Sequence, residues 1–241
     1  NDSAWFCVEE PKKHIKITKN TYFYIKCGPG PKKYTQILKD NGIIVVHVVA
    51  NQKFALKCID AGVDAIVAEG FEAGGHNGIE EITTMCLIPQ IKSIVDIPLI
   101  AAGGIGSGKS ILAAMSLGAD AVQIGSLFAA SKESSAHINF KNKIIESNDG
   151  DTVLTLKEIT PVRLLKNEFY FQVENAYRKN ASVEDLRDIL SKGRAKKGIF
   201  EGNIIDGELE IGQISSSISK IQSVDQIFKK LIDEFNYKID Y

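Results

Sequence analysis

The sequence predicts an α/β fold in which short parallel strands alternate with helices, and three observations support this. Nearly continuous apolar runs rich in β-branched residues recur along the first half of the chain. Such runs are typical of parallel strands, which are covered on both faces. Helix-like segments separate them, and several of these end near a glycine. The repeat of roughly 20 to 35 residues is typical of a parallel sheet or barrel.

The predicted elements follow one another in a regular order. Strands are predicted at Tyr22–Lys26, Ile43–Val49, Ala65–Ala68, Leu99–Ala102 and Ala121–Ile124. Helices are predicted between them at Lys32–Asp40, Gln52–Ala61, Thr84–Ser93 and Lys109–Leu117. Beyond Phe128 the charge and apolar patterns predict helices at Glu133–Glu146, Glu168–Lys179, Val183–Lys192 and Val224–Phe235, with a loop or short hairpin at Gly202–Gly212. We therefore expect a partial (β/α) barrel over residues 1–128 and a helical region over residues 129–241 packed on it.

Composition excludes several classes of partner. The formal net charge is −1, so no global field attracts the chain to nucleic acid or acidic lipid. The four cysteines lie far apart without a Cys-x-x-Cys pair, which argues against a zinc site and indicates a reducing compartment. No apolar run approaches the ~20 residues of a membrane-spanning helix, and no secretory leader opens the chain. The sequence predicts a cytoplasmic protein without a metal, nucleic-acid or membrane partner.

Glycine-rich turns follow three of the predicted strands and mark a candidate site. Four glycines lie within nine residues after Ala65–Ala68, and His76 lies among them. Because histidine titrates near neutral pH, we interpret His76 as a catalytic residue. His47 lies in the middle of a strand, and we interpret it as a core or barrel-lining residue.

The next two strands run into the turns Gly103-Gly104 and Gly125-Ser126. Two successive glycine-rich turns of this kind are typical of the phosphate site that TIM barrels build after their last two strands.

The run Gly103–Ser110 also satisfies the P-loop pattern Gly-x₄-Gly-Lys-Ser, which predicts a nucleoside-triphosphate site. A P-loop normally follows the first strand of its domain, whereas this run follows the fourth predicted strand. No later strand ends in an aspartate that could hold magnesium. We therefore rank the P-loop interpretation low.

The three glycine motifs, in their order along the chain, resemble the nitronate monooxygenase family, also called 2-nitropropane dioxygenases. The motifs are Ala68-Glu69-Gly70 through His76, Ile100-Ala101-Ala102-Gly103-Gly104-Ile105 and Val122-Gln123-Ile124-Gly125-Ser126. The similarity runs from about Ile43 to Gln213, and it includes Asp151-Thr152, Arg163 with Asn167, and Gly212-Gln213. A close relative of the family is the FMN-dependent enoyl-acyl-carrier-protein reductase.

The resemblance implies a TIM (β/α)₈-type barrel with FMN at the carboxyl ends of its strands and a C-terminal helical cap. Gly103, Gly104, Gln123, Gly125 and Ser126 would hold the phosphate of the flavin. Glu69, Gly74 and Gly75 would lie near the flavin and its ribityl chain. His76 would be the catalytic residue facing the flavin ring.

The resemblance further implies oxidative denitrification of alkyl nitronates with dioxygen. One alternative keeps the FMN site but takes hydride from NAD(P)H and reduces an enoyl thioester. A second is a flavin- or phosphate-binding module without catalytic activity. A homodimer is left open.

The family opens with further strands that this sequence does not show. Five strands cannot close an eight-stranded barrel. We expect that the chain is a fragment lacking the first strands, or that residues 1–20 replace them. As a fragment it should be poorly soluble and bind FMN weakly, because its apolar strand edges would be exposed.

Overall fold

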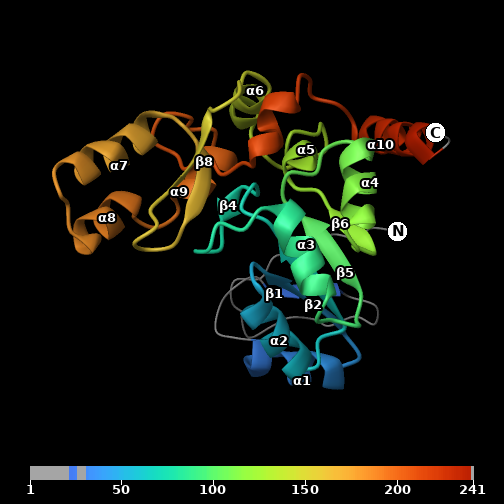
Figure 1. Ribbon diagram of the computed structural model, residues 1–241. Helices are drawn as coiled ribbons and strands as arrows, with labels where there is room; N and C mark the ends of the chain where they lie inside the picture. The colour runs from blue at the N-terminus through green and yellow to red at the C-terminus, as the bar shows by residue number, and fades with distance from the viewer. Residues whose placement is uncertain (1–21, 26–30, 240–241) are drawn as a thin grey trace.

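The computed structural model describes residues 22–25 and 31–239, and their centre is a parallel five-stranded sheet (Figure 1). The sheet has the order β1-β2-β3-β5-β6. Its strands are β1 (Tyr22–Ile25), β2 (Ile44–Val49), β3 (Ala65–Glu69), β5 (Leu99–Ala102) and β6 (Ala121–Gln123). The five predicted strands are confirmed to within one residue at each described end, and Lys26, predicted as the last residue of the first strand, lies outside the described residues. Because they are parallel, their carboxyl ends meet at one edge of the sheet.

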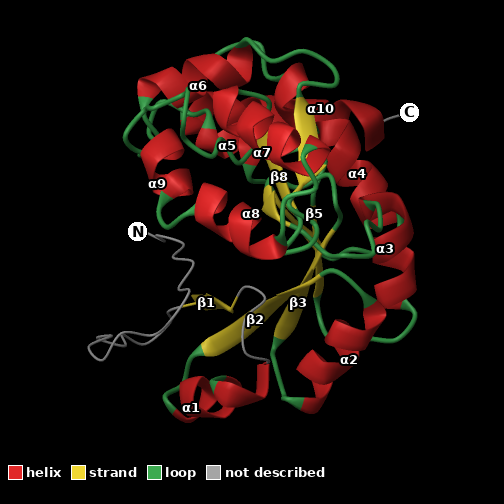
Figure 2. Cartoon of the chain, turned by 90° about the vertical axis from the view of Figure 1, so that its left-hand side faces the viewer, coloured by secondary structure: helices red, strands yellow, loops and turns green. Residues whose placement is uncertain are grey.

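Helices follow the strands along one side of the sheet (Figure 2). They are the short 3₁₀ helix Pro31–Lys33, α1 (Thr35–Asp40), α2 (Gln52–Asp60), α3 (Thr84–Lys92) and α4 (Gly108–Ser116). The strand residues Val45, Val49 and Ile66 pack with the helix residues Leu87 and Ile91 in the main apolar cluster. A second cluster on the other face contains Val46, Val48 and Val67. Burial on both faces explains why these strands are nearly continuous apolar runs.

Two aspartates connect neighbouring strands in the same way. Asp64, just before β3, accepts hydrogen bonds from Val45 N (2.8 Å) in β2 and from Lys39 Nζ (2.7 Å) in α1. Asp120, just before β6, repeats this arrangement with the start of β5 and the end of α3. The hydrogen bond from Leu99 N, together with the adjacent lysine, holds the pKa of Asp120 below its usual value. Each aspartate lies two residues after a glycine that follows a helix, Gly62 or Gly118.

His47 is buried in β2, as the sequence predicts. It is 4% exposed, and its Nδ1 lies 2.9 Å from the Val48 carbonyl oxygen. Burial lowers the pKa of His47 below its ordinary value, which favours the neutral ring.

The C-terminal half is helical, as expected. It contains α5 (Ser126–Ala129), α6 (Ile138–Ile145), α7 (Glu168–Arg178), α8 (Val183–Leu190), α9 (Arg194–Ile199), the 3₁₀ helix Gln213–Ser217 and α10 (Val224–Ile239). The predicted helix at Glu133–Glu146 begins later, at Ile138. Gly202–Gly212 is a loop with one isolated β-bridge at Glu210. The helix α10 returns to pack on α4.

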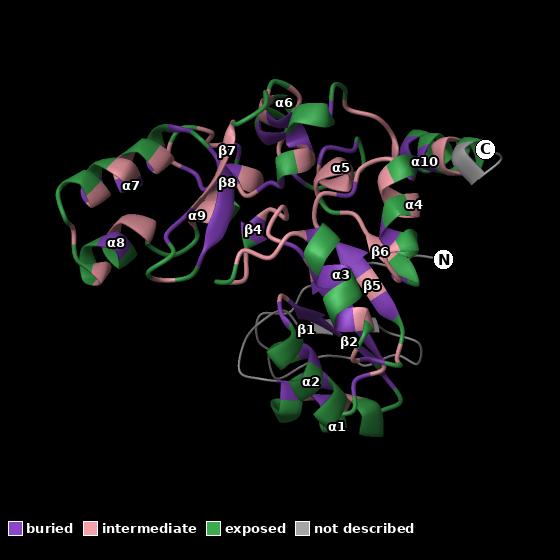
Figure 3. Cartoon of the chain, viewed as in Figure 1, coloured by how far each residue is buried: buried purple, intermediate pink, exposed green. Residues whose placement is uncertain are grey.

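One expectation for this half is corrected, because it is not wholly helical. The strands β7 (Thr152–Thr155) and β8 (Val162–Leu165) form an antiparallel sheet with the two-residue strand β4 (Gly75–His76), in the order β4-β8-β7. All four residues of β8 are buried, Arg163 included, so its sequence lacks the polar–apolar alternation of a half-exposed strand (Figure 3). Because β4 belongs to the first half of the chain, this sheet joins the two halves. The domain boundary at residues 128–129 stays a proposal.

Candidate functional site

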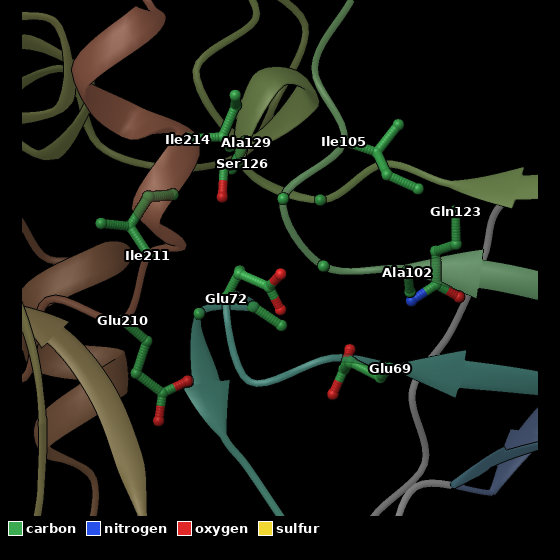
Figure 4. A pocket seen from close by; sticks show the side chains of 15 residues that line it. Glu69, Glu72, Ala102, Ile105, Gln123, Ser126, Ala129, Glu210, Ile211 and Ile214 are labelled. Atoms are coloured by element: carbon green, nitrogen blue, oxygen red, sulfur yellow. The ribbon is translucent and has the colours of Figure 1, made fainter. Parts of the chain in front are cut away.

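A cavity of about 220 Å³ lies where the carboxyl ends of β3, β5 and β6 meet the C-terminal half (Figure 4). Its lining includes seven of the nine residues predicted for the site: Glu69, Gly74, Gly103, Gly104, Gln123, Gly125 and Ser126. These residues come from three strand ends and lie up to 57 positions apart in the printed sequence. The structure thus brings most of the predicted cofactor-binding residues to one cavity.

The two glycine turns line the cavity with backbone amides. Gly103 has a φ of +93°, and a Cβ atom there would lie 2.7 Å from the Gly70 carbonyl oxygen. Next to Gly125 nothing lies within 4 Å of the position of a Cβ. Within the described part of the chain, the amides of Gly104, Gly125 and Ser126 have no hydrogen-bond partner. An anionic group could therefore approach these donors closely.

A second wall of the cavity comes from the C-terminal half. It consists of Glu210, Ile211 and Ile214, which lie opposite Gln123 and Ala102 in Figure 4. None of these three residues was predicted from the sequence, although the family resemblance includes the adjacent Gly212-Gln213.

Close backbone contacts attach this wall to the barrel. Gly212 N donates to Ser126 Oγ (3.0 Å), and Gln213 N donates to the Glu72 carbonyl oxygen (2.9 Å). A Cβ atom on Gly74 would lie only 2.4 Å from the Ile211 carbonyl carbon. Ser126 therefore has a structural contact in addition to its predicted role at the phosphate.

Glu72 also lines the cavity and was not predicted as a site residue. Its carboxylate accepts hydrogen bonds from Thr84 N (3.0 Å to each oxygen) and from Thr84 Oγ1 (3.1 Å). Thr84 is the first residue of α3, so the negative charge lies at the amino end of a helix, where it is stabilised. A glutamate within a glycine-rich turn was the available signal in the sequence.

Gly75 and His76 do not line the cavity. Both belong to β4, where Gly75 pairs with Arg163 and His76 pairs with Val162. His76 lies next to the cavity, since its Nδ1 is 3.9 Å from Oε1 of the lining residue Glu210. Its side chain is about half exposed. The predicted catalytic histidine is thus in contact with the site through one carboxylate.

Arg163 is a buried residue of β8 that contacts the first half of the chain. Arg163 is 2% exposed, its Nε donates to the Phe71 carbonyl oxygen (2.9 Å), and its guanidinium lies 5.1 Å from the centre of the Phe71 ring. Burial lowers the pKa of Arg163, and the charges of Glu72 and Glu81 oppose this change. Arg163 therefore links the antiparallel sheet to the glycine loop that carries His76.

A buried carboxyl lies two residues before Glu210. Glu208 is 6% exposed, and burial together with the charge of Glu210 raises its pKa to about 7. Arg194 opposes this change. Within the described residues no cluster of histidine, cysteine or carboxylate side chains could hold a metal ion.

The geometry of Gly103–Ser110 disfavours the P-loop interpretation. Ser110 Oγ accepts the amides of Gly106 (3.1 Å) and Ser107 (2.9 Å), and Ser107 caps the helix in return. The amide of Gly108 donates to the carboxylate of Glu234 in α10 (2.9 Å). Three amides of this run, those of Gly106, Ser107 and Gly108, are thus already occupied within the protein and do not face a phosphate as in a P-loop.

Comparisons with known proteins agree with the resemblance seen in the sequence. A model of the nitronate monooxygenase family matches residues 13–234. A protein of Staphylococcus aureus (strain JH9), named probable nitronate monooxygenase, is 41% identical over 85% of this chain and 59% of its own length. One of Bacillus subtilis (strain 168) with the same name is 32% identical over 85% of this chain and 61% of its own. The chain thus spans about 60% of the length of these curated relatives.

Solved structures match as well. FabK from Thermotoga maritima is 36% identical, with a TM-score of 0.83 over 92% of this chain and 69% of that one. Nitroalkane oxidase from Streptomyces ansochromogenes is 27% identical, with a TM-score of 0.72 over 93% of this chain and 66% of that one. These matches confirm the predicted fold class, an α/β fold of the TIM-barrel type. No helix in the described residues is long and apolar enough to cross a membrane.

Proposed function

Because the chain belongs to the nitronate monooxygenase family, we propose that it forms the cofactor-binding and catalytic part of an FMN-dependent enzyme that oxidises alkyl nitronates. The reaction consumes dioxygen and yields a carbonyl compound and nitrite. The family is one of flavoenzymes, and a bound flavin supplies the electron-transfer chemistry. The observation that carries the proposal is the cavity lined by the glycine turns of β5 and β6.

The residues of the cavity fit a flavin phosphate. The amides of Gly104, Gly125 and Ser126 are donors without partners in the described residues, and no atom lies within 4 Å of a Cβ position on Gly125. Gln123 adds a side-chain amide at the same edge. Glu69 and Gly74, which line the cavity, and Gly75, which follows Gly74 in β4, would lie toward the ribityl chain and the ring. None of the lining side chains is basic, so the backbone amides would bind the phosphate.

His76 would handle the substrate. A histidine next to the cavity can donate a hydrogen bond to the oxygens of a nitronate, or accept the α-proton of a neutral nitroalkane. Its exposed ring is able to reach a molecule that enters from solvent.

Titration of the full-length protein with FMN tests the cofactor assignment. We expect the flavin absorbance spectrum to change on binding, whereas ATP with magnesium should produce no binding signal. A protein that binds ATP with magnesium and shows no affinity for FMN would overturn the proposal. As a control, Lys109→Ala should leave FMN affinity unchanged, because Lys109 does not line the cavity.

Activity assays then separate the two candidate reactions. We expect oxygen consumption and nitrite release from an alkyl nitronate without nicotinamide. His76→Asn should lower this turnover by roughly 10²–10⁴-fold, the usual contribution of an acid–base group, while FMN affinity stays within a few-fold. Anaerobic bleaching of the flavin by NADPH, with reduction of an enoyl thioester and no response to nitronate, would favour the reductase instead.

A further inference from the structure

One strand holds His76 and Glu210 next to each other, although they are far apart in the sequence. The strand β7 occupies one edge of β8 along its whole length. On the opposite edge, Val162 pairs with His76 and Leu164 forms an isolated bridge with Glu210. Val162 and Leu164 are two positions apart, so their side chains lie on the same face of the sheet. His76 and Glu210, which pair with them, therefore direct their side chains to that face as well.

This arrangement leads to the new assignment. We propose that Glu210 is a positioning residue for His76. Its carboxylate accepts a hydrogen bond from Nδ1–H of the ring and so leaves Nε2 free to act on the substrate. The distance of 3.9 Å between His76 Nδ1 and Glu210 Oε1 is within ion-pair range, and a small side-chain rotation would close it to a hydrogen bond. The assignment rests on the proposed role of His76.

The backbone of Glu210 is held firmly enough to position a partner. Leu165 N donates to the Leu209 carbonyl oxygen (2.9 Å), and the flanking residues Leu209 and Ile211 are 0% and 3% exposed. The Glu210 side chain is 20% exposed, against 48% for His76. The carboxylate is therefore the more buried member of the pair and the imidazole the more exposed one.

The neighbouring carboxyl supports this division of roles. Glu208 is more deeply buried than Glu210, and its pKa is raised to about 7. The more buried carboxyl, Glu208, therefore takes up a proton readily. Glu210 is the carboxyl that faces the imidazole ring of His76. In the described residues His76 is also the one basic side chain within ion-pair distance of Glu210.

The chemical consequence concerns the tautomer of the ring. A neutral imidazole carries one proton, and the hydrogen bond made by one nitrogen decides which nitrogen carries it. A carboxylate at Nδ1 selects the Nδ1–H form, whose Nε2 can accept the α-proton of a neutral nitroalkane and can then donate a hydrogen bond to the nitronate oxygens. Loss of an orienting carboxylate in other enzymes lowers turnover strongly because the wrong tautomer forms.

Nitrogen-15 NMR of histidine-labelled full-length protein reads the tautomer directly, with the His76 signals assigned from their loss in His76→Asn. We expect the Nδ1–H form in the wild-type protein and a shift toward the Nε2–H form in Glu210→Leu. The isosteric variant Glu210→Gln serves if the leucine variant folds poorly, and it should show a smaller shift. Glu201→Gln, which removes an exposed carboxylate paired with Lys196, is the matched control and should not change the spectrum.

Kinetics provide the second measurement. Glu210→Leu should lower kcat by about 10–10³-fold with KM changed by less than about threefold, and adding it to His76→Asn should cause no further loss. An unchanged tautomer in Glu210→Leu, or additive losses in the double variant, would refute the positioning role. If the tautomer shifts but His76→Asn keeps full activity, the positioning contact stands and the proposed catalytic role of His76 fails.

Discussion

At the scale of single residues, the chain places its carboxylates in contrasting surroundings around one cavity. Glu72 is held by the amide and hydroxyl of Thr84 at the start of α3, Glu210 faces His76, and Glu208 is buried behind Glu210. Each environment has a different physical consequence: the hydrogen bonds from Thr84 orient the carboxylate of Glu72, whereas burial raises the pKa of Glu208. The positions of these three glutamates in the sequence do not reveal their different environments, because each environment depends on contacts with segments far away in the chain.

Glu208 should make the stability of the protein depend on pH. Its carboxyl keeps a proton up to about pH 7 in the folded state, whereas in the unfolded chain it loses the proton near 4.5. The folded state binds more protons in this interval, so stability falls as the pH rises from about 4.5 to 7. Glu208→Gln, which has a similar shape and no charge, should be more stable than wild type above pH 7 by about 1–3 kcal/mol, since one pKa unit corresponds to about 1.4 kcal/mol.

Urea denaturation at pH 5 and pH 8 measures this effect. The gain from Glu208→Gln should be present at pH 8 and largely absent at pH 5. An equal gain at both values would show that the side chain acts through packing and not through its ionisation.

At the scale of elements, the helices are fixed by polar side chains at their ends. Asn167 is the example with the most partners. Its Oδ1 accepts Tyr170 N (3.1 Å) at the start of α7, and its Nδ2 donates to the carbonyl oxygens of Ile204 (3.0 Å) and Gly207 (2.8 Å). One side chain thus caps a helix and anchors the loop that leads to Glu208 and Glu210.

Asn167→Ala should destabilise the protein by about 2–4 kcal/mol. It removes a helix cap, which costs about 1 kcal/mol, and leaves two carbonyl groups in a site that is 9% exposed without their donor. Ser182→Ala removes the exposed cap of α8 and should cost no more than about 1 kcal/mol. Equal losses in thermal denaturation would mean that the loop contacts of Asn167 contribute nothing.

At the scale of the whole molecule, the site lies between the parallel sheet and the C-terminal half of the chain. The parallel sheet with its helices provides the glycine turns, and the C-terminal half provides Glu210, Ile211 and Ile214. The contact of Gly74 with Ile211 and Gly212 closes this junction at backbone-to-backbone distance. The cavity is therefore complete only when the parallel sheet and the C-terminal half are packed together correctly.

Gly74→Ala should disrupt the contact between the glycine-rich loop and the C-terminal half. Its Cβ would lie 2.4 Å from the Ile211 carbonyl carbon and 2.6 Å from Gly212 N, so backbone atoms would have to move. We expect a loss of about 1–3 kcal/mol in stability and an FMN affinity at least about tenfold weaker. Gly62→Ala, where φ is +76° and no atom lies within 4 Å, is the control. It should be strained and less stable but should keep its FMN affinity, and a similar affinity loss in both variants would contradict the role of the junction.

The sequence by itself determined the parallel strands, the helices between them and the positions of the glycine turns. Strands such as β2 are buried on both faces, so an apolar run identifies them without knowledge of their neighbours. The turns after β5 and β6 meet because parallel strands end at the same edge, and the seven predicted residues that line the cavity came from this rule together with the family resemblance.

Only the tertiary structure decided the antiparallel sheet, the second wall of the cavity and the partner of His76. The strand β4 has two residues, and β8 contains a buried arginine, so neither shows a recognisable period. Glu210 lies in a loop and owes its place to a bridge with Leu164. Such pairings depend on packing between segments far apart in the chain, which the local pattern around each residue does not encode.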